Sequence, residues 1–247
     1  MVETTGRQTR FQRHVGTALI TVGISLFGVL LYKFWWTNIS SDRTAAQTRK
    51  ELQSQWEGSA EPTTTSDTPP STVALSDIKS MDTPQENEAF ALLYIPRLID
   101  DAWGVPILQG VNLELLSQGV GHYSESSLPD AEGNFALFGH RTANGEPFVH
   151  IEKLKAGDDV IVETENYWFV YTLKLDRIVS PSALGVVSNA PLSELQTVPG
   201  DPYQVITLIT CEPRWSTEKR WVWWGTLSAV YPRETPPLVI KVLDKNL

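Results

Sequence analysis

The sequence predicts a mainly β protein: a closed or nearly closed barrel of about eight strands with short helices, preceded by an apolar helix and a linker. Beyond about residue 89, aromatic and β-branched residues occur in short runs separated by Gly, Pro and Asn-Gly, which is typical of many short strands. Helical patterns long enough to connect parallel strands are missing, which argues against an α/β sheet. The segment before residue 37 differs from the rest, because it contains a long apolar run.

Residues 15–36 predict a transmembrane signal anchor. No charged residue occurs from Val15 to Tyr32, and Phe34-Trp35-Trp36 follows, like an aromatic belt at a membrane interface. Basic residues precede the run, so the positive-inside rule predicts a cytoplasmic tail over residues 1–14 and an outward-facing remainder. A cleaved signal peptide is the alternative, but no small-residue cleavage site follows the apolar run. The three basic residues nearest the run are Arg7, Arg10 and Arg13.

Residues 37–88 predict a flexible extracytoplasmic linker. They are rich in Ser, Thr, Gln, Asp, Glu and Pro, a composition that buries too little apolar surface to offset chain entropy. A short helix over Ala45–Trp56 is the alternative for part of this segment. The remaining residues, 89–247, are of a length that suits one domain with a full core.

Within residues 89–247 the hydrophobic periodicity is mostly that of strands. Tyr167–Leu175 places its apolar residues on alternate positions, and Asp159–Glu163 precedes it as a second strand. Thr164-Glu165-Asn166 joins the two in a pattern that favours a hairpin. Short helices are expected at Leu113–Ser117 and Pro147–Leu154. Further expected strands are Phe90–Ile95, Val105–Leu108, Asn134–Phe138, Gln204–Thr210, Trp221–Tyr231 and Leu238–Leu243.

Charge and motif content exclude several functional classes. The net charge of −9 and an acidic predicted domain argue against nucleic-acid binding. The sequence has no His-Glu-x-x-His or Cys-x-x-Cys pattern and no Gly-rich phosphate loop, so we expect neither a cofactor nor a metal.

The single cysteine, Cys211, is the strongest candidate for a catalytic residue. It ends the strand-like run 205–211. A protein that faces an oxidising compartment normally pairs its cysteines or lacks them, so a lone thiol at a strand end favours a nucleophile. The histidines of the domain all precede Cys211, which excludes the order found in papain-type proteases.

A thiol nucleophile needs a proton donor and acceptor, and a group that stabilises developing negative charge. His140 follows the strand-like run 134–138 and a Gly, whereas His122 lies in a second Gly-rich context. The residues alone do not decide between the two histidines. If 204–211 and 221–231 are adjacent strands, Arg220 begins the second strand near Cys211, and its charged planar fork suits an anionic intermediate.

Several short motifs in the predicted domain occur in the same order in one known family. They are Leu93-Tyr94-Ile95-Pro96, Gly119-x-Gly121-His122-Tyr123, Gly139-His140 and Thr207-Leu208-Ile209-Thr210-Cys211, followed by Arg220. On these motifs the chain resembles the sortases, membrane-anchored cysteine transpeptidases of Gram-positive bacteria, over roughly residues 90–231. Gly139-His140-Arg141-Thr142 and Cys211-x-Pro213-x-Trp215 look most like the class E sortases of actinobacteria.

The resemblance implies a sortase-type barrel and a catalytic set of Cys211, His140 and Arg220. Thr210, Arg141 and His122 are the accompanying candidates for substrate binding. It further implies a single-pass protein of the cell membrane with an extracellular catalytic domain. This enzyme would cleave a Leu-Ala-x-Thr-Gly or Leu-Pro-x-Thr-Gly sorting signal between Thr and Gly on secreted proteins.

The resemblance also implies a partner that accepts the cleaved protein. The expected acceptor is an amine of a lipid-linked cell-wall precursor peptide. The alternatives are a pilin-polymerising enzyme that uses a pilin lysine, a hydrolase that cleaves without transfer, and a catalytically inactive, membrane-tethered binding module.

Overall fold

Eight strands among the described residues form a closed barrel, so the predicted fold class is confirmed in this respect. The computed structural model describes residues 4–59, 71–142, 144–189 and 204–244. Around the barrel the strands follow one another in the order β1-β2-β3-β4-β7-β8-β6-β5. Their bounds are β1 (Ala89–Tyr94), β2 (Trp103–Gln109), β3 (Val120–His122), β4 (Gly133–Phe138), β5 (Asp159–Glu163), β6 (Tyr167–Val179), β7 (Gln204–Glu212) and β8 (Lys219–Pro232).

Most neighbouring strands are antiparallel, but β2 pairs with β3 and β4 pairs with β7 in parallel. The long strands β6 and β8 pair along Tyr167–Val179, and β8 forms a hairpin with β7 on its other side. Parallel neighbours require connections that leave the sheet and return. Short helices occupy several of the connections: α2 (Leu113–Leu116), η2 (Pro96–Leu98), η3 (Ile151–Lys153) and η4 (Leu184–Val187).

The strand β7 is buried on both faces. Ile206 and Leu208 point into the main core of the barrel, whereas Val205 and Ile209 belong to a second apolar cluster outside it. Val186, from η4, packs against this second cluster. Burial on both sides explains why β7 reads in the sequence as a nearly continuous apolar run instead of an alternating one.

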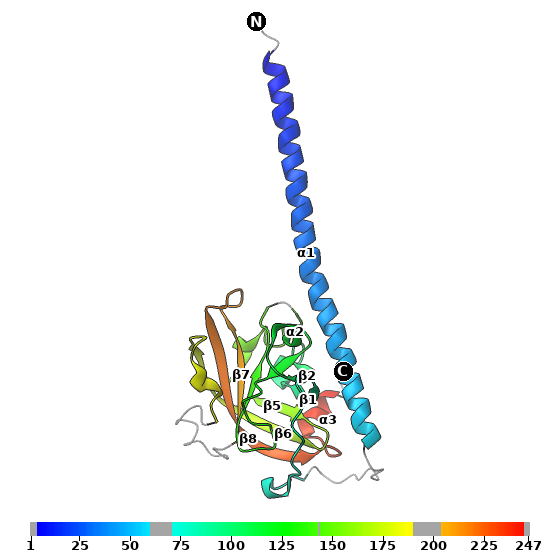
Figure 1. Cartoon of the computed structure of the whole chain (residues 1–247), viewed down its shortest axis with the longest axis vertical. Helices are drawn as coiled ribbons and strands as arrows, with labels where there is room; N and C mark the ends of the chain where they lie inside the picture. The colour runs from blue at the N-terminus through cyan, green and yellow to red at the C-terminus, as the bar shows by residue number, and fades with distance from the viewer. Residues whose placement is uncertain (1–3, 60–70, 143, 190–203, 245–247) are drawn as a thin grey trace.

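Helix α1 (Thr4–Ser59) is far longer than any other element and runs along one side of the barrel (Figure 1). Its C-terminal part lies beside β1 and β2, and its N-terminal part projects beyond the barrel. Residues 15–36 are helical, as predicted. Within the residues that the structure describes, no helix is both long and apolar enough to span a membrane.

The predicted flexible linker, residues 37–88, is largely ordered in its described parts. Residues 37–59 continue α1, as in the helical alternative for this segment, and Leu52 and Trp56 are only 5% and 6% exposed. Arg49 Nη1 donates to the carbonyl of Trp103 at 3.3 Å. Residues 71–88 lie along the barrel, and the amide of Val73 donates to the Val230 carbonyl at 2.8 Å.

Leu52 and Trp56 share one helical face at a spacing of four, so these few apolar residues are enough to pack the end of α1 in an apolar cluster.

The prediction of a strand at Leu238–Leu243 is wrong, because this segment lies in helix α3 (Leu238–Asp244). Pro236 and Pro237 precede it, and the fixed φ of proline favours the first turn of a helix. The amide of Ile240 donates to the Pro237 carbonyl at 3.0 Å. Ile240 is buried with Leu52 and Trp56, so α3 and the end of α1 form one apolar cluster on the outside of the barrel (Figure 1).

The packing of Trp56 generates the first testable prediction. Its ring lies in the cluster on α1 and α3, and the guanidinium of Arg233 stands 5.0 Å from its centroid. We expect Trp56→Ala to weaken docking of α1 by about 2 kcal/mol or more, because a buried aromatic side chain is lost. Amide hydrogen exchange should then accelerate over residues 41–58, while the barrel strands keep their protection. The control is Trp215→Ala, which removes an exposed ring; equal protection of α1 in both variants would contradict the docking described here.

Candidate active site

The parallel pairing of β4 with β7 places His140 and Cys211 at the same level. The last paired positions are Phe138 and Ile209; His140 follows two residues after Phe138, just beyond the end of β4, and Cys211 follows two residues after Ile209, within β7. The pairing continues past the ladder, because the amide of Gly139 donates to the Ile209 carbonyl at 3.1 Å. The hydroxyl of Thr210 donates to the Gly139 carbonyl at 2.8 Å and holds the two strand ends together.

The antiparallel pairing of β7 with β8 brings Arg220 to Cys211. The two residues are direct cross-strand partners. Side chains of directly opposed residues project from the same face of a sheet, with Cβ atoms about 4.5–5.5 Å apart. The expectation that Arg220 begins a strand adjacent to that of Cys211 is therefore confirmed.

His140, Cys211 and Arg220 line one cleft of about 750 Å³. Much of the remaining lining is apolar and comes from the segment around α2, from the ends of β4 and β7 and from the loop after β7. The sequence did not identify the α2 wall, although Leu113, at 77% exposure in a β-rich domain, is a signal that could have indicated it. The apolar lining residues are Val111, Leu113, Leu116, Phe138, Ile209 and Trp215.

The imidazole of His140 is suited to accept a proton near neutral pH. Burial lowers its pKa from the ordinary histidine value, because the charged form loses solvation. Its Nε2 atom is buried and has no hydrogen-bond partner among the described residues. The backbone of His140 is also held in place, because the amide of Phe148 donates to the His140 carbonyl at 3.1 Å.

The guanidinium of Arg220 is held by its own hairpin. Its Nη1 donates to the carbonyls of Thr217 and Lys219 at 2.9 and 3.0 Å. These bonds fix one terminal nitrogen of the guanidinium, and Arg220 lines the cleft. A cation in this position can stabilise negative charge that develops on a neighbouring oxygen.

The three candidates for substrate binding differ in position. Thr210 and Arg141 line the cleft, although both are almost fully buried. His122 is 1% exposed, is absent from the cleft lining and packs against Phe90 and Phe135. We therefore do not retain His122 as a substrate contact; its Nδ1 lies 2.6 Å from Oε1 of Gln109, inside the barrel.

Around Cys211 lie further charged residues that the sequence did not single out. Glu212 and Glu152 both pair with the guanidinium of Arg141. Arg214, also in the cleft lining, pairs with Glu146 at 3.2 Å. No sequence signal links these partners, since they lie 11 to 71 residues apart along the chain and meet only through the fold.

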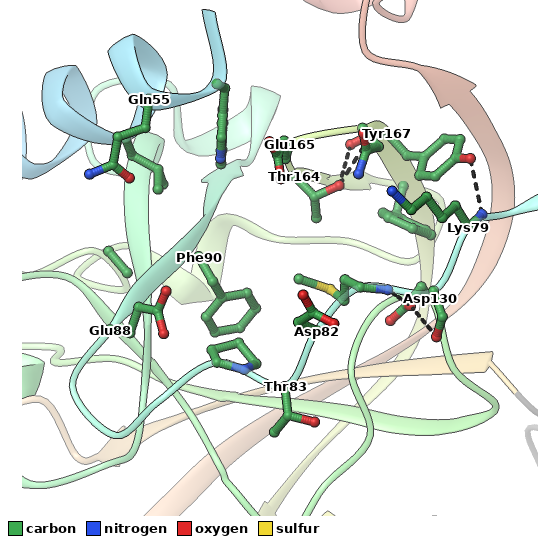
Figure 2. Close-up of a pocket in the computed structure, with 18 of the residues that line it drawn as sticks. Gln55, Lys79, Asp82, Thr83, Glu88, Phe90, Asp130, Thr164, Glu165 and Tyr167 are labelled. Carbon is green, nitrogen blue, oxygen red and sulfur yellow. Dashed lines mark hydrogen bonds between the residues drawn. The ribbon is translucent and has the colours of Figure 1, made fainter. Parts of the chain in front are cut away.

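A second, polar cleft of about 520 Å³ lies away from these residues (Figure 2). It is enclosed by the end of α1, the segment 79–90 and the turn between β5 and β6. Figure 2 shows the amide of Lys79 bonded to the hydroxyl of Tyr167, at 3.0 Å, and Asp130 bonded to the same segment. None of Cys211, His140 and Arg220 lines it, so it is not the candidate active site.

A closed, mainly β barrel with a cysteine, a histidine and an arginine in one cleft defines the class of protein to which this chain belongs. The comparison with protein families gives that class its name: the model of the sortase domain matches residues 93–228. The chain therefore belongs to the sortase family, whose members are cysteine transpeptidases.

Individual relatives support this assignment. Sortase SrtE1 of Streptomyces coelicolor is 34% identical over 229 residues, which are 90% of this chain and 58% of the relative, so the chain spans somewhat more than half of that protein. The crystal structure of Sortase E1 from Streptomyces coelicolor with a tripeptide in the active site is 36% identical, with a TM-score of 0.56 over 62% of this chain and 97% of that one. Sortase E from Streptomyces avermitilis is 32% identical, with a TM-score of 0.55 over 63% and 99%. These relatives fit the class E assignment expected from the sequence.

Burial of His122 generates a second testable prediction. Desolvation lowers its pKa to about 4, whereas an unfolded histidine titrates near about 6.5. At pH 7 both states are neutral, and between pH 6.5 and 4 the unfolded state binds the proton first. The free energy of unfolding should therefore fall by about 3 kcal/mol over that range.

Denaturant unfolding of wild-type protein and of His122→Gln at several pH values measures this contribution. Because the other titrating groups are common to both proteins, the difference between the two curves isolates His122. We expect the variant to lose this part of the pH dependence; parallel curves would contradict a buried neutral imidazole.

Proposed function

We propose that this chain is a sortase that cleaves a C-terminal sorting signal between Thr and Gly and transfers the new C-terminus to an amine. The single observation that carries the proposal is the meeting of Cys211, His140 and Arg220 at one cleft through the pairing of β4, β7 and β8. The first catalytic step requires a deprotonated thiol. His140, kept neutral by burial, accepts the Cys211 proton, and the thiolate then attacks the Thr carbonyl carbon.

The attack forms the C–S bond and moves negative charge onto the carbonyl oxygen, which the guanidinium of Arg220 stabilises. When this intermediate collapses, the C–N bond to Gly breaks. The imidazolium of His140 donates its proton to the departing Gly nitrogen, which leaves as an amine. The acyl part of the substrate stays on Cys211 as a thioester, and His140 is again neutral.

The second half-reaction reverses the direction of proton transfer. An incoming amine attacks the thioester, His140 accepts a proton from the attacking nitrogen, and the thiolate of Cys211 leaves. The imidazolium then returns the proton to the thiolate, which regenerates the starting state. Water in place of the amine would give hydrolysis by the same steps.

The proposed substrates are secreted proteins with a Leu-Ala-x-Thr-Gly signal, or its Leu-Pro-x-Thr-Gly variant. The resemblance to class E sortases implies the first, and the solved structure of Sortase E1 from Streptomyces coelicolor has a tripeptide in its active site. The apolar wall formed by Val111, Leu113 and Leu116 suits the leucine side chain of such a signal. The proposed acceptor is the amine of a cell-wall precursor peptide.

Attachment to the cell membrane through the N-terminal half of α1 is part of the proposal. Its support is the uncharged run from Val15 to Tyr32 and the exposure of its apolar side chains, of which Leu19 is 68% and Ile24 67% exposed. The orientation that follows from the preceding arginines places the barrel outside the cell, where both substrates are expected. Cell fractionation tests this part: the full chain should sediment with membranes and resist alkaline extraction, and release into the soluble fraction would contradict it.

Product analysis with the full-length chain tests the reaction. We expect a Leu-Ala-x-Thr-Gly peptide to be cleaved at Thr-Gly, and mass spectrometry should show ligation to an added amine. Cys211→Ala should lose both products, and His140→Gln and Arg220→Gln should lower the rate by about 100-fold or more.

The same experiment separates the alternatives. Ligation to a pilin lysine in preference to a cell-wall peptide would favour a pilin-polymerising enzyme. Cleavage without transfer would indicate a hydrolase. Absence of cleavage with both peptide signals would leave a binding module and would overturn the proposed reaction.

A further inference from the structure

Arg141 follows His140 directly and contacts the residue that follows Cys211. The Arg141 side chain is 8% exposed, and its Nη1 forms an ion pair with the carboxylate of Glu212. The same Nη1 lies 3.4 Å from the carbonyl oxygen of Cys211. Its Nη2 pairs with Glu152 at 3.2 Å. One guanidinium therefore joins the end of β4, the end of β7 and the segment η3.

The guanidinium also reaches the strand that carries Arg220. Its Cζ atom lies 5.1 Å from the ring centroid of Trp221, within the range of a cation–π contact. Trp221 follows Arg220 directly, and its Nε1 donates to Asp176 on β6 at 2.8 Å. The contact partner on β8 is thus itself anchored to the neighbouring strand.

These contacts lie on the face of the sheet opposite to Cys211 and Arg220. Those two are cross-strand partners and share one face, so Glu212 and Trp221, each one residue further along its strand, share the other. The Arg141 side chain reaches this second face, because it contacts both Glu212 and Trp221. His140, Cys211 and Arg220 line the cleft together with Arg141, and the Arg141 guanidinium extends from there to Glu212 and Trp221, which do not line it.

From this arrangement we propose that Arg141 is a positioning residue that fixes the relative placement of His140, Cys211 and Arg220. It acts through the peptide bonds that join each contacting residue to its catalytic neighbour. A displacement of the guanidinium moves the ends of β4 and β7 relative to each other, and the proton path between His140 and Cys211 changes with them. The inference rests on the proposed function, since it concerns residues that would perform that reaction.

The chemistry of the contacts favours arginine specifically. The planar fork bonds to two carboxylates and a carbonyl while its flat face packs on an indole ring. A lysine supplies the charge but neither the fork nor the flat face. The Nε of Arg141 is buried without a partner among the described residues, so a contact with the substrate is the competing role. Loss of a positioning residue lowers kcat, whereas loss of a substrate contact raises KM.

Steady-state kinetics on the full-length chain with the sorting-signal peptide test the proposal. The variants are Arg141→Gln, Arg141→Lys, Glu212→Gln and the double variant Arg141→Gln with Glu212→Gln. The control is Arg97→Gln, which breaks a carboxylate pair with Asp158 that is outside the cleft. Thermal unfolding shows which variants remain folded; if Arg141→Gln does not, Arg141→Lys and Glu212→Gln carry the test.

We expect Arg141→Gln to lower kcat by about 100-fold with KM changed by no more than about twofold, because a misplacement of about 1 Å can cost this much. Arg141→Lys should recover only part of kcat, and the double variant should lose no more than Arg141→Gln alone, since both residues act through one contact. Arg97→Gln should match wild type.

A raised KM at unchanged kcat would overturn the proposal and indicate a substrate contact, and so would wild-type kcat in every Arg141 variant. If wild type itself cleaves no peptide, the proposed function fails separately. The rate at which iodoacetamide alkylates Cys211 then decides the inference. If Arg141 positions Cys211, this rate differs between Arg141→Gln and Arg97→Gln; equal rates would overturn the proposal.

Discussion

The register of β7 against its two neighbours is the constraint on which the rest of the structure depends. On one side β7 pairs in parallel with β4, and on the other it pairs antiparallel with β8. A slip of one residue in either pairing would move Cys211 to the opposite face and separate it from His140 or Arg220. Such a slip would also expose part of the apolar surface, because β7 is buried in the barrel core on one face and beneath η4 on the other.

Buried polar contacts reinforce this register. The hydroxyl of Thr207 donates to Oδ1 of Asn134 at 2.6 Å, between β7 and β4. The amide of the same Asn134 donates to the Val186 and Ser188 carbonyls, both at 3.1 Å, and so holds η4 over the outer face. Because a buried polar group without its partner costs free energy, these bonds disfavour alternative pairings. At the strand ends, the hydrogen bond from Thr210 to the Gly139 carbonyl and the ion pair between Arg141 and Glu212 also join the ends of β4 and β7.

The sequence predicted the strands well where one face is apolar or where a run is continuous, as in Tyr167–Leu175 and Gln204–Thr210, because burial itself creates these patterns. It missed β3, which has only three residues, too few for a period to be recognised. It also misassigned Leu238–Leu243, where the apolar residues suit either structure and the two preceding prolines decide for a helix.

At the candidate site, sequence motifs identified Cys211, His140 and Arg220, and the sheet register brings these three together. The partners of Arg141 could not be predicted, because Glu152, Glu212 and Trp221 come from three separate segments. The place of His122 inside the barrel could not be predicted for a related reason: a Gly-rich context indicates close backbone approach and does not reveal which face of the barrel the side chain occupies. Its burial depends on Phe90 and Phe135, which the sequence does not connect with it.

Trapping the acyl-enzyme is the most direct test of the central claim, which is that the register makes Cys211 a nucleophile served by His140 and Arg220. The full-length chain would be mixed with a sorting-signal peptide without an amine, quenched in acid, and measured by intact-protein mass spectrometry and digestion. We predict a mass increase equal to the acyl part of the peptide up to Thr, located on the fragment that contains Cys211 and absent from Cys211→Ser. Peptide cleavage with no adduct, or with an adduct on another residue, would contradict the account.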